Sequence, residues 1–298
     1  MRDDALTRLG LDPEKARDFV RRALEEDLQW GEDVTSRATL PGTTVTATAH
    51  ARECGVLAGV AVGILAPEVY APGLLSVNVH KADGERVQTG DAVLSFTGPV
   101  TDILTVERTV LNIICQLSGV ATHTARWVEA LSGEVSALTG DPVRVRDTRK
   151  TVPGMRILQK MAVRCGGGLN HRMGLGDEAL IKDNHIAAVG SVANAIARVR
   201  ERYPEIPVEV ECDSVDQVVE AIGAGVSLIL LDNMDPDTIE RALRHTVPAG
   251  VKTEASGGLT LENAKEYAAT GVDYIAVGAL THSSRVFDIG LDMDPLGE

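Results

Sequence analysis

From residue 144 onward, short apolar segments alternate with helical patterns at a steady spacing. The apolar segments are VRVRDT, ALIKDN, PVEVEC, SLILLDN, VKTEAS and DYIAVG. Apolar periodicity predicts helices between them, at roughly 152–165, 189–202, 214–223, 235–245 and 260–270. Strands that alternate with helices form parallel sheets with right-handed crossovers, so this part of the chain is predicted to be an α/β structure.

Six strand–helix units in so short a segment indicate a β/α barrel that need not be complete. A flat, doubly wound parallel sheet is the alternative. No GxGxxG sequence follows the first strand, which disfavours the dinucleotide-binding version of that alternative.

The preceding part of the chain has a different pattern. Residues 12–28 are predicted to form an amphipathic helix, and residues 101–131 a long helix. Between them, TTVTATAHA, GVLAGVAVG and LLSVNVHKADGERVQTGDAVLSFTG are β-type runs separated by glycine turns. The change of pattern places a domain boundary near residue 115.

Composition excludes several classes of protein. The net charge of −14, the pI near 5.0 and the aromatic content of 3% argue against a nucleic-acid-binding surface, which needs basic and aromatic groups. No uninterrupted apolar run is long enough for a membrane span, and the charged N-terminus lacks a signal-peptide core. We therefore expect a cytoplasmic protein without membrane or nucleic-acid partners.

The four cysteines, Cys54, Cys115, Cys165 and Cys212, are widely spaced and form no CxxC pair. This spacing indicates reduced thiols and argues against a zinc site or a disulfide framework. Cys165, beside three glycines, is a weaker candidate for a nucleophile, because no neighbouring group that would activate it is visible.

Residues 144–185 are cationic in an otherwise acidic chain. They contain nine Lys or Arg residues and only four acids. Several of these cations lie beside Gly, Asn, His or Thr and have no acid at helical spacing. A local charge of the opposite sign to the whole protein predicts a pocket for an anion.

Polar residues also follow the predicted strands at the point where each one ends. In a β/α barrel these ends meet on one face, where active sites form. A single polar residue there is often a helix cap, but six strands with such residues indicate a site. The residues are Thr148, Arg149, Lys150, Lys182, Asp183, Asn184, Glu211, Asp232, Asn233, Glu254, Ser256 and Gly278.

These residue types predict the ligands. Arg149 and Arg172 can each bind a carboxylate through two hydrogen bonds, whereas Lys150 and Lys182 provide point charges for phosphate. Glu211 and Asp232 end adjacent predicted strands and suit Mg²⁺ held together with substrate oxygens. The alternative for the two acids is that they neutralise nearby cations.

Two glycine-containing loops follow the last two strands. Ser256, Gly257 and Gly258 precede a predicted helix, and Gly278 and Ala279 follow the final strand. Loops at these positions of a barrel bind phosphate through backbone N–H groups and a helix N-terminus.

The long motifs of the chain resemble those of the quinolinate phosphoribosyltransferase family. They are RDTRKTVPGMR, CGGGLNHRMGLGDEALIKDNH, VEVEC, LILLDN, EASGG, VGALTHS and, earlier, ERTVLNIICQLSGVATHT. The resemblance implies an N-terminal α/β sandwich, residues 1–115, and an open β/α barrel of six to seven parallel strands, residues 116–283. The tail 284–298 is expected to pack on the first domain.

The resemblance also implies an activity. Family members convert quinolinate and phosphoribosyl pyrophosphate to nicotinate mononucleotide, pyrophosphate and CO₂ with Mg²⁺, in NAD biosynthesis. They are homo-oligomers, dimers or hexamers, so this chain is expected to form at least a dimer. Ala255 replaces a serine that some members carry, a departure with little effect beside Ser256.

Roles are carried over to the matching positions. Arg149, His171 and Arg172 would hold the two quinolinate carboxylates, with Arg108 reaching in from a neighbouring subunit. Lys150 and Lys182 would contact the substrates and act in catalysis together with Glu211 and Asp232, which would bind Mg²⁺ or ribose hydroxyls. The remaining substrate-binding residues would be Thr148, Ser256, Gly257, Gly258, Gly278, Ala279 and His282.

Two other functions stay open at this point. One is a related phosphoribosyltransferase-like enzyme for another anionic ring substrate, although the Arg149, His171 and Arg172 set favours a dicarboxylate. The other is a biotinyl- or lipoyl-like carrier, because residues 78–98 have a similar strand and turn rhythm. Lys81, however, does not lie in the tight hairpin that such carriers modify.

Overall fold

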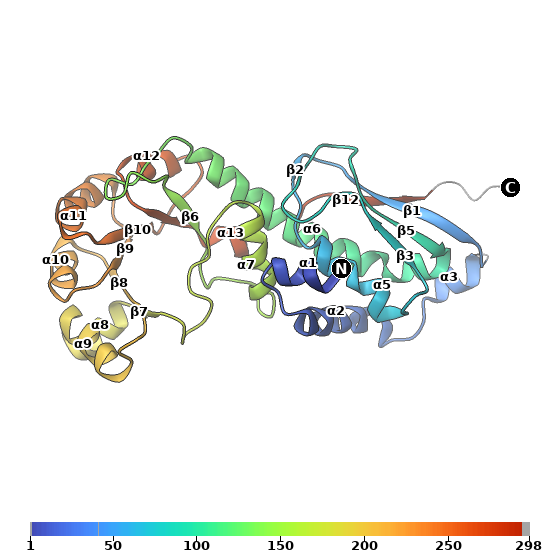
Figure 1. Ribbon diagram of the computed structural model, residues 1–298, viewed down its shortest axis with the longest axis horizontal. Helices are drawn as coiled ribbons and strands as arrows, with labels where there is room; N and C mark the ends of the chain where they lie inside the picture. The colour runs from blue at the N-terminus through green and yellow to red at the C-terminus, as the bar shows by residue number, and fades with distance from the viewer. Residues whose placement is uncertain (1, 41, 294–298) are drawn as a thin grey trace. The chain divides into compact units, whose positions relative to one another are not determined.

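The computed structural model describes residues 2–40 and 42–293, which form two compact units (Figure 1). Among these residues, the first unit contains 2–40, 42–123, 157–167 and 283–293, and the second contains 124–156 and 168–282. The units interleave along the chain. The boundary near residue 115 stays a prediction about domains.

The first unit is built on a four-stranded antiparallel sheet in the order β12-β1-β5-β3. Alternate residues of β1 are buried, Ala47, Ala49 and Ala51 among them, so one face of the strand packs into the core. A short β2–β4 pair lies apart from this sheet. The strands are β1 (Thr44–Ala51), β2 (Gly55–Val56), β3 (Ser76–Val79), β4 (Arg86–Val87), β5 (Ala92–Pro99) and β12 (Ile289–Met293).

The C-terminal segment belongs to this sheet, since β12 pairs with β1 from Ala51 opposite Ile289 to Ala47 opposite Met293. Part of the predicted tail, residues 294–298, lies outside the described residues.

Helices complete the first unit, and α2 shows how the sequence determines one of them. Asp12 accepts hydrogen bonds from the N–H groups of Glu14 and Lys15, and Pro13 occupies the first helical position. Val20 and Leu24 are buried on the face turned to the core. The helices are α1 (Arg2–Arg8), α2 (Pro13–Leu28), α3 (Val34–Thr39), α4 (Val60–Gly63), α5 (Leu65–Tyr70) and, starting one residue before the unit's segment, α7 (Arg156–Cys165).

The expected β-type run at residues 55–63 is wrong over most of its length. Only Gly55 and Val56 are in a strand, and the chain then turns into α4 and α5. The Asp83 carboxylate accepts hydrogen bonds from the N–H groups of Val60 and Ala61, which fixes the start of α4. An acid more than twenty residues away therefore decides the conformation of this apolar segment.

Helix α6 (Val100–Ala130) contributes residues to both units. It is the one helix in the described part of the chain that is long and apolar enough to cross a membrane. Within the structure, 67% of its apolar window is buried, as in the core helix of a globular protein. No membrane function follows from its length.

The second unit contains the six predicted strands in one parallel sheet, in the order β6-β11-β10-β9-β8-β7. Each strand from β7 to β11 pairs with the next one along the chain, and β6 joins at β11. This is the order of a β/α barrel left open between β6 and β7 and not that of a doubly wound sheet. The strands are β6 (Arg144–Arg146), β7 (Ala179–Ile181), β8 (Val208–Cys212), β9 (Leu228–Asp232), β10 (Lys252–Ser256) and β11 (Tyr274–Ala276).

A helix follows every strand of this sheet. The helix expected over 189–202 is α9, which Ser191 caps, and a further helix, α8, precedes it and ends at Gly190, which has a positive φ. The helices of the sheet are α8 (Asp183–Val189), α9 (Val192–Arg202), α10 (Val215–Gly223), α11 (Pro236–Ala249), α12 (Ala264–Ala269) and α13 (Ala279–His282). The α/β fold class is therefore confirmed.

Gly119, inside α6, offers a test of packing in the first unit. A Cβ atom there would lie 2.1 Å from the carbonyl oxygen of Arg285. Gly119→Ala should therefore destabilise the protein by about 1–3 kcal/mol through overpacking. Gly223→Ala is the matched control, because no atom lies within 4 Å of a Cβ at this helical glycine. Thermal unfolding should show a lower Tm for the first variant only; equal Tm values would contradict the close approach.

Candidate active site

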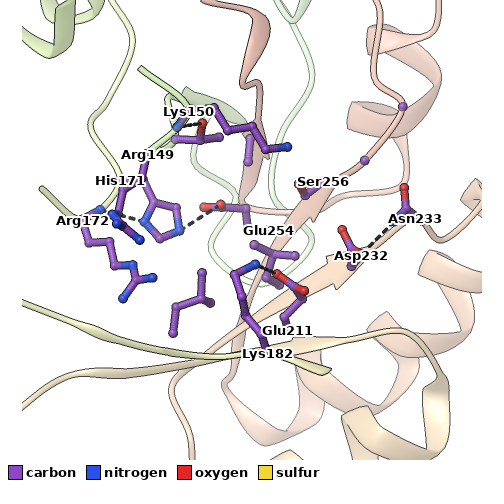
Figure 2. A pocket seen from close by; sticks show the side chains of 16 residues that line it. Arg149, Lys150, His171, Arg172, Lys182, Glu211, Asp232, Asn233, Glu254 and Ser256 are labelled. Atoms are coloured by element: carbon purple, nitrogen blue, oxygen red, sulfur yellow. Dashed lines mark hydrogen bonds and ion pairs between the residues drawn. The ribbon is translucent and has the colours of Figure 1, made fainter. Parts of the chain in front are cut away.

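A pocket of about 590 Å³ lies at the carboxyl ends of the parallel strands (Figure 2). Side chains that follow or end all six strands contribute to its lining. Eleven of the predicted site residues are among them: Thr148, Arg149, Lys150, His171, Arg172, Lys182, Glu211, Asp232, Ser256, Gly257 and Gly258. The open barrel thus brings together residues more than 100 positions apart in the sequence.

Three further predicted residues lie beside this lining. A Cβ atom at Gly278 would be 2.9 Å from Cδ of Lys150 and 3.3 Å from Nε2 of His282. Ala279 is the first residue of α13, and Thr281 in the same helix donates a hydrogen bond to the Lys150 carbonyl. The loop after β11 therefore supports the Lys150 segment.

Arg108 lies on α6 in the first unit, and its side chain is 66% exposed. Its contribution to a neighbouring subunit stays a prediction.

Two arginines form the cationic part of the pocket. The Nε atoms of Arg149 and Arg172 are buried and have no hydrogen-bond partner among the described residues. Desolvation, together with repulsion from Arg172 and Arg156, lowers the pKa of Arg149 from its ordinary value. Desolvated guanidinium groups without an acid partner are suited to bind a carboxylate or another anion.

Asp147, which sequence reasoning did not select, attaches the loop that carries His171 and Arg172 to the end of β6. Its carboxylate is buried and accepts hydrogen bonds from the His171 N–H at 2.9 Å and from Asn170 Nδ2 at 2.6 Å. The position directly before Thr148, in the RDTRK motif, was the available signal. Asp147 positions the arginine loop and does not itself line the pocket.

Two carboxylates lie on the neighbouring strands β8 and β9. Glu211 forms an ion pair with Lys182, and Asp232 accepts a hydrogen bond from Asn233 Nδ2 at 2.7 Å. The predicted alternative, neutralisation of a cation, therefore holds for Glu211. Because Mg²⁺ takes oxygen ligands and commonly shares one or two carboxylates with phosphate, this donor set fits the ion.

The loop after β10 has a backbone that requires glycine. Gly257 and Gly258 have φ angles of +95° and +62°, and a Cβ at Gly257 would lie 2.1 Å from Asn233 Oδ1. The helix expected directly after these glycines begins only at Ala264. The loop backbone and not the helix N-terminus is thus what faces the pocket.

Several pocket residues lie deeper along the strands. The prediction missed three of them, Leu180, Leu230 and Ala276, and had noted Glu254 only as a polar strand end. Leu180, Leu230, Glu254 and Ala276 each precede a rim residue by two positions, so they point to the same side of the sheet. They form the floor of the pocket, and Asn233, which the sequence analysis named as a strand-end residue, lies at the rim. Counting back two residues from each rim residue would have identified the floor.

A polar cluster extends from this floor, at His171 and Glu254, to residues that lie beneath it. His171 Nε2 lies 2.9 Å from Glu209 Oε2 and 3.5 Å from Glu254 Oε1, and Arg146 pairs with Glu254. Desolvation raises the pKa of both glutamates above the ordinary value.

His171, Glu178 and Glu209 could together supply ligand atoms to a metal ion, since these atoms lie within 4.8 Å of one another. The charge of Arg146, which also acts on Glu209, disfavours a cation there.

The open six-stranded sheet, with arginines on one side of the pocket and carboxylates and a glycine loop on the other, defines an α/β enzyme for anionic substrates. Residues 33–118 match the family described as quinolinate phosphoribosyl transferase, N-terminal domain, and residues 120–292 match the C-terminal domain of that family. The chain therefore belongs to the quinolinate phosphoribosyl transferase family. The first match includes residues 78–98, so the carrier alternative loses its support.

Individual relatives are similar to this chain over most of their own length. The nicotinate-nucleotide pyrophosphorylase (carboxylating) of Mycobacterium leprae is 51% identical over 93% of this chain and 97% of its own. A protein of Bacillus subtilis, described as probably the same enzyme, is 42% identical over 90% of each chain. The solved structure of NadC from Streptococcus pyogenes has a TM-score of 0.87 at 38% identity and covers 96% of this chain and 99% of that chain.

The cysteines allow a test of whether a thiol takes part in the chemistry. Burial raises the pKa of Cys165 and Cys212 to about 12, and it also raises the pKa of Cys115, whereas Cys54 is exposed. At neutral pH we expect iodoacetamide to label only Cys54 in the folded protein and all four cysteines after denaturation. Mass spectrometry of the peptides would measure this. Rapid labelling of Cys165 in the folded protein would revive it as a nucleophile.

Proposed function

We propose that the chain transfers the phosphoribosyl group of phosphoribosyl pyrophosphate to quinolinate, with loss of CO₂, giving nicotinate mononucleotide and pyrophosphate. The observation that carries the proposal is the pocket itself. Two arginines whose buried Nε atoms have no hydrogen-bond partner among the described residues lie in the same cavity as two carboxylates and a glycine loop. Membership of the family and the names of the relatives support the same activity.

Quinolinate would bind at the arginine side of the pocket. Its two carboxylates are adjacent on the pyridine ring, and Arg149 and Arg172 lie next to one another on two separate segments of the chain. Each guanidinium can donate two parallel hydrogen bonds to one carboxylate. His171 and, from a neighbouring subunit, Arg108 would complete this subsite.

The sugar diphosphate would bind at the opposite side. Lys150 and Lys182 would contact its phosphate oxygens, and Glu211 and Asp232 would hold ribose hydroxyls or Mg²⁺. Backbone N–H groups of the Gly257–Gly258 loop suit the 5′-phosphate, because no side chain there obstructs the approach. Ser256 and Thr148 would add hydroxyl donors, and Gly278, Ala279 and His282 would border the same subsite.

In the reaction, the bond between the anomeric carbon and the pyrophosphate oxygen breaks, and pyrophosphate leaves with the electron pair. The lone pair of the quinolinate nitrogen then forms the new bond to that carbon. Lys150 and Lys182 stabilise the charge that develops on pyrophosphate, and the arginines hold the nitrogen in line with the carbon. Mg²⁺, when bound by Glu211 and Asp232, would lower the charge of the leaving diphosphate further.

Decarboxylation follows from the charge on the ring. Once the nitrogen carries the sugar it is cationic, so it stabilises the electron pair left at the ring carbon when the adjacent carboxylate departs as CO₂. That carbon then takes a proton from water. No protein nucleophile is needed, which agrees with the protonated state of Cys165.

A homo-oligomer, at least a dimer, is part of the proposal, because Arg108 would complete the site of a neighbouring subunit. We also propose the cytoplasm as the compartment, since four free cysteines suit a reducing environment.

The direct test is an assay of the purified protein with quinolinate, phosphoribosyl pyrophosphate and Mg²⁺, in which nicotinate mononucleotide is measured by chromatography. We expect product, and we expect EDTA to reduce the rate and excess Mg²⁺ to restore it. Folded protein that forms no product above background would sink the proposal. Product formation that is insensitive to EDTA would remove Mg²⁺ from it.

Arg172→Ala separates the two subsites. Loss of charge-assisted hydrogen bonds to a carboxylate should raise KM for quinolinate at least about tenfold and change KM for the sugar diphosphate by less than about twofold. Steady-state kinetics with each substrate varied in turn would measure both constants. Arg244→Ala, which removes an exposed arginine on α11, is the control and should leave both unchanged. Equal increases in the two constants would contradict the assignment of Arg172.

A further inference from the structure

Beneath the floor of the pocket lies a glutamate whose burial is not explained by any of the roles assigned above. Glu209 is fully buried on β8, two residues before Glu211. Among the described residues, neither of its carboxylate oxygens accepts a hydrogen bond, and its close contact is an ion-pair distance to His171. Burying a carboxylate without donors costs several kcal/mol, so a functional contact is expected to offset this cost.

His171 provides that contact. Its Nε2 atom lies 2.9 Å from Oε2 of Glu209. On the other side of the ring, Nδ1 accepts a hydrogen bond of 2.7 Å from the backbone N–H of Arg172. Because Nδ1 is the acceptor, the ring proton belongs on Nε2, where it faces the carboxylate. Glu209 thus favours one tautomer and one orientation of the ring.

A second carboxylate contributes to the same arrangement. Glu254 Oε1 lies 3.5 Å from His171 Nε2, and its other oxygen pairs with Arg146 Nη1 at 2.5 Å. Figure 2 shows Glu254 directed at the imidazole ring from the neighbouring part of the floor. Arg146 is bonded directly to Glu254 and acts on Glu209 only through its charge, so the Nε2 atom of His171 is the polar group nearest to the Glu209 carboxylate.

We propose that Glu209 is a positioning residue of the quinolinate subsite: it fixes the ring of His171, and through the Nδ1 contact it fixes the backbone from which Arg172 reaches the substrate. The Glu254–Arg146 pair supports the same orientation of the His171 ring, since Glu254 also lies close to Nε2. This inference rests on the proposed function for its kinetic part. The main role of His171 is then to hold Arg172 in place, because both nitrogens of its ring already have protein partners.

Two variants at one position test the proposal. Glu209→Leu keeps a similar volume but removes the acceptor, whereas Glu209→Gln keeps an oxygen that can accept from Nε2–H. We expect Glu209→Leu to raise KM for quinolinate at least about tenfold, with less than about a twofold change for the sugar diphosphate. Glu209→Gln should return KM for quinolinate to within about threefold of the wild type. A role in packing alone predicts no such rescue, so equal constants for the two variants would overturn the proposal.

Asp273→Asn is the control for loss of a buried carboxylate. Asp273 lies in the same unit, is 6% exposed and binds Ser136 and the Thr253 N–H away from the pocket lining. The Asp273→Asn variant should have a lower Tm than the wild type but no selective change in KM for quinolinate. A selective change in this variant as large as in Glu209→Leu would overturn the proposal as well.

A spectroscopic measurement makes the test independent of activity and of the Leu variant. Long-range ¹H–¹⁵N NMR spectra distinguish the two neutral tautomers of histidine, and the His171 signals are assigned by their absence in His171→Gln. We expect the Nε2–H tautomer in the wild type and in Glu209→Gln. An Nδ1–H tautomer in the wild type would overturn the inference even if the assay confirmed the enzyme. An inactive wild-type protein with the expected tautomer would reject the proposed function and retain the placement of the ring.

Discussion

The site depends on one geometric constraint: successive side chains of a strand point to opposite sides of the sheet. Every second residue of the six parallel strands therefore faces the same interior, and the last such residue of each strand reaches the rim. Glu209 and Glu211 share β8 in this way, as do Glu254 and Ser256 on β10. In the proposed function the rim would bind substrate, and the layer beneath it supports the rim.

Charge balance inside this unit follows from that layering. Lys182 pairs with Glu211 at the rim, and Arg146 pairs with Glu254 one layer below. Arg149 and Arg172 are the exceptions, because their Nε atoms are buried without a partner among the described residues. Burying polar N–H groups without a partner costs stability, and in the proposed function an anionic substrate would bind these groups.

Much of the fold and of the rim could be predicted from the sequence, for physical reasons. The six strands are contiguous apolar runs, and polar residues that are unusual in a core follow them. The sequence pattern therefore predicted both the strands and the rim residues. The helical conformation of α4 could not be predicted in this way, because the Asp83 carboxylate that fixes its start lies more than twenty residues away in the sequence. Asp147 and Glu209 were not selected, and Glu254 was noted only as a polar residue at the end of a strand. Only the fold shows that they are buried around His171.

The pairing of β12 with β1 has a consequence for the order of folding. The two strands are separated by more than two hundred residues, and the Arg285 segment packs against Gly119 of the same unit. During synthesis the sheet of the first unit therefore lacks an edge strand until β12 emerges, by which time every strand of the barrel has already emerged. The first unit would begin to be synthesised before the second but would complete its fold after it. Until β12 pairs with β1, the edge of β1 would be open to pairing with other chains.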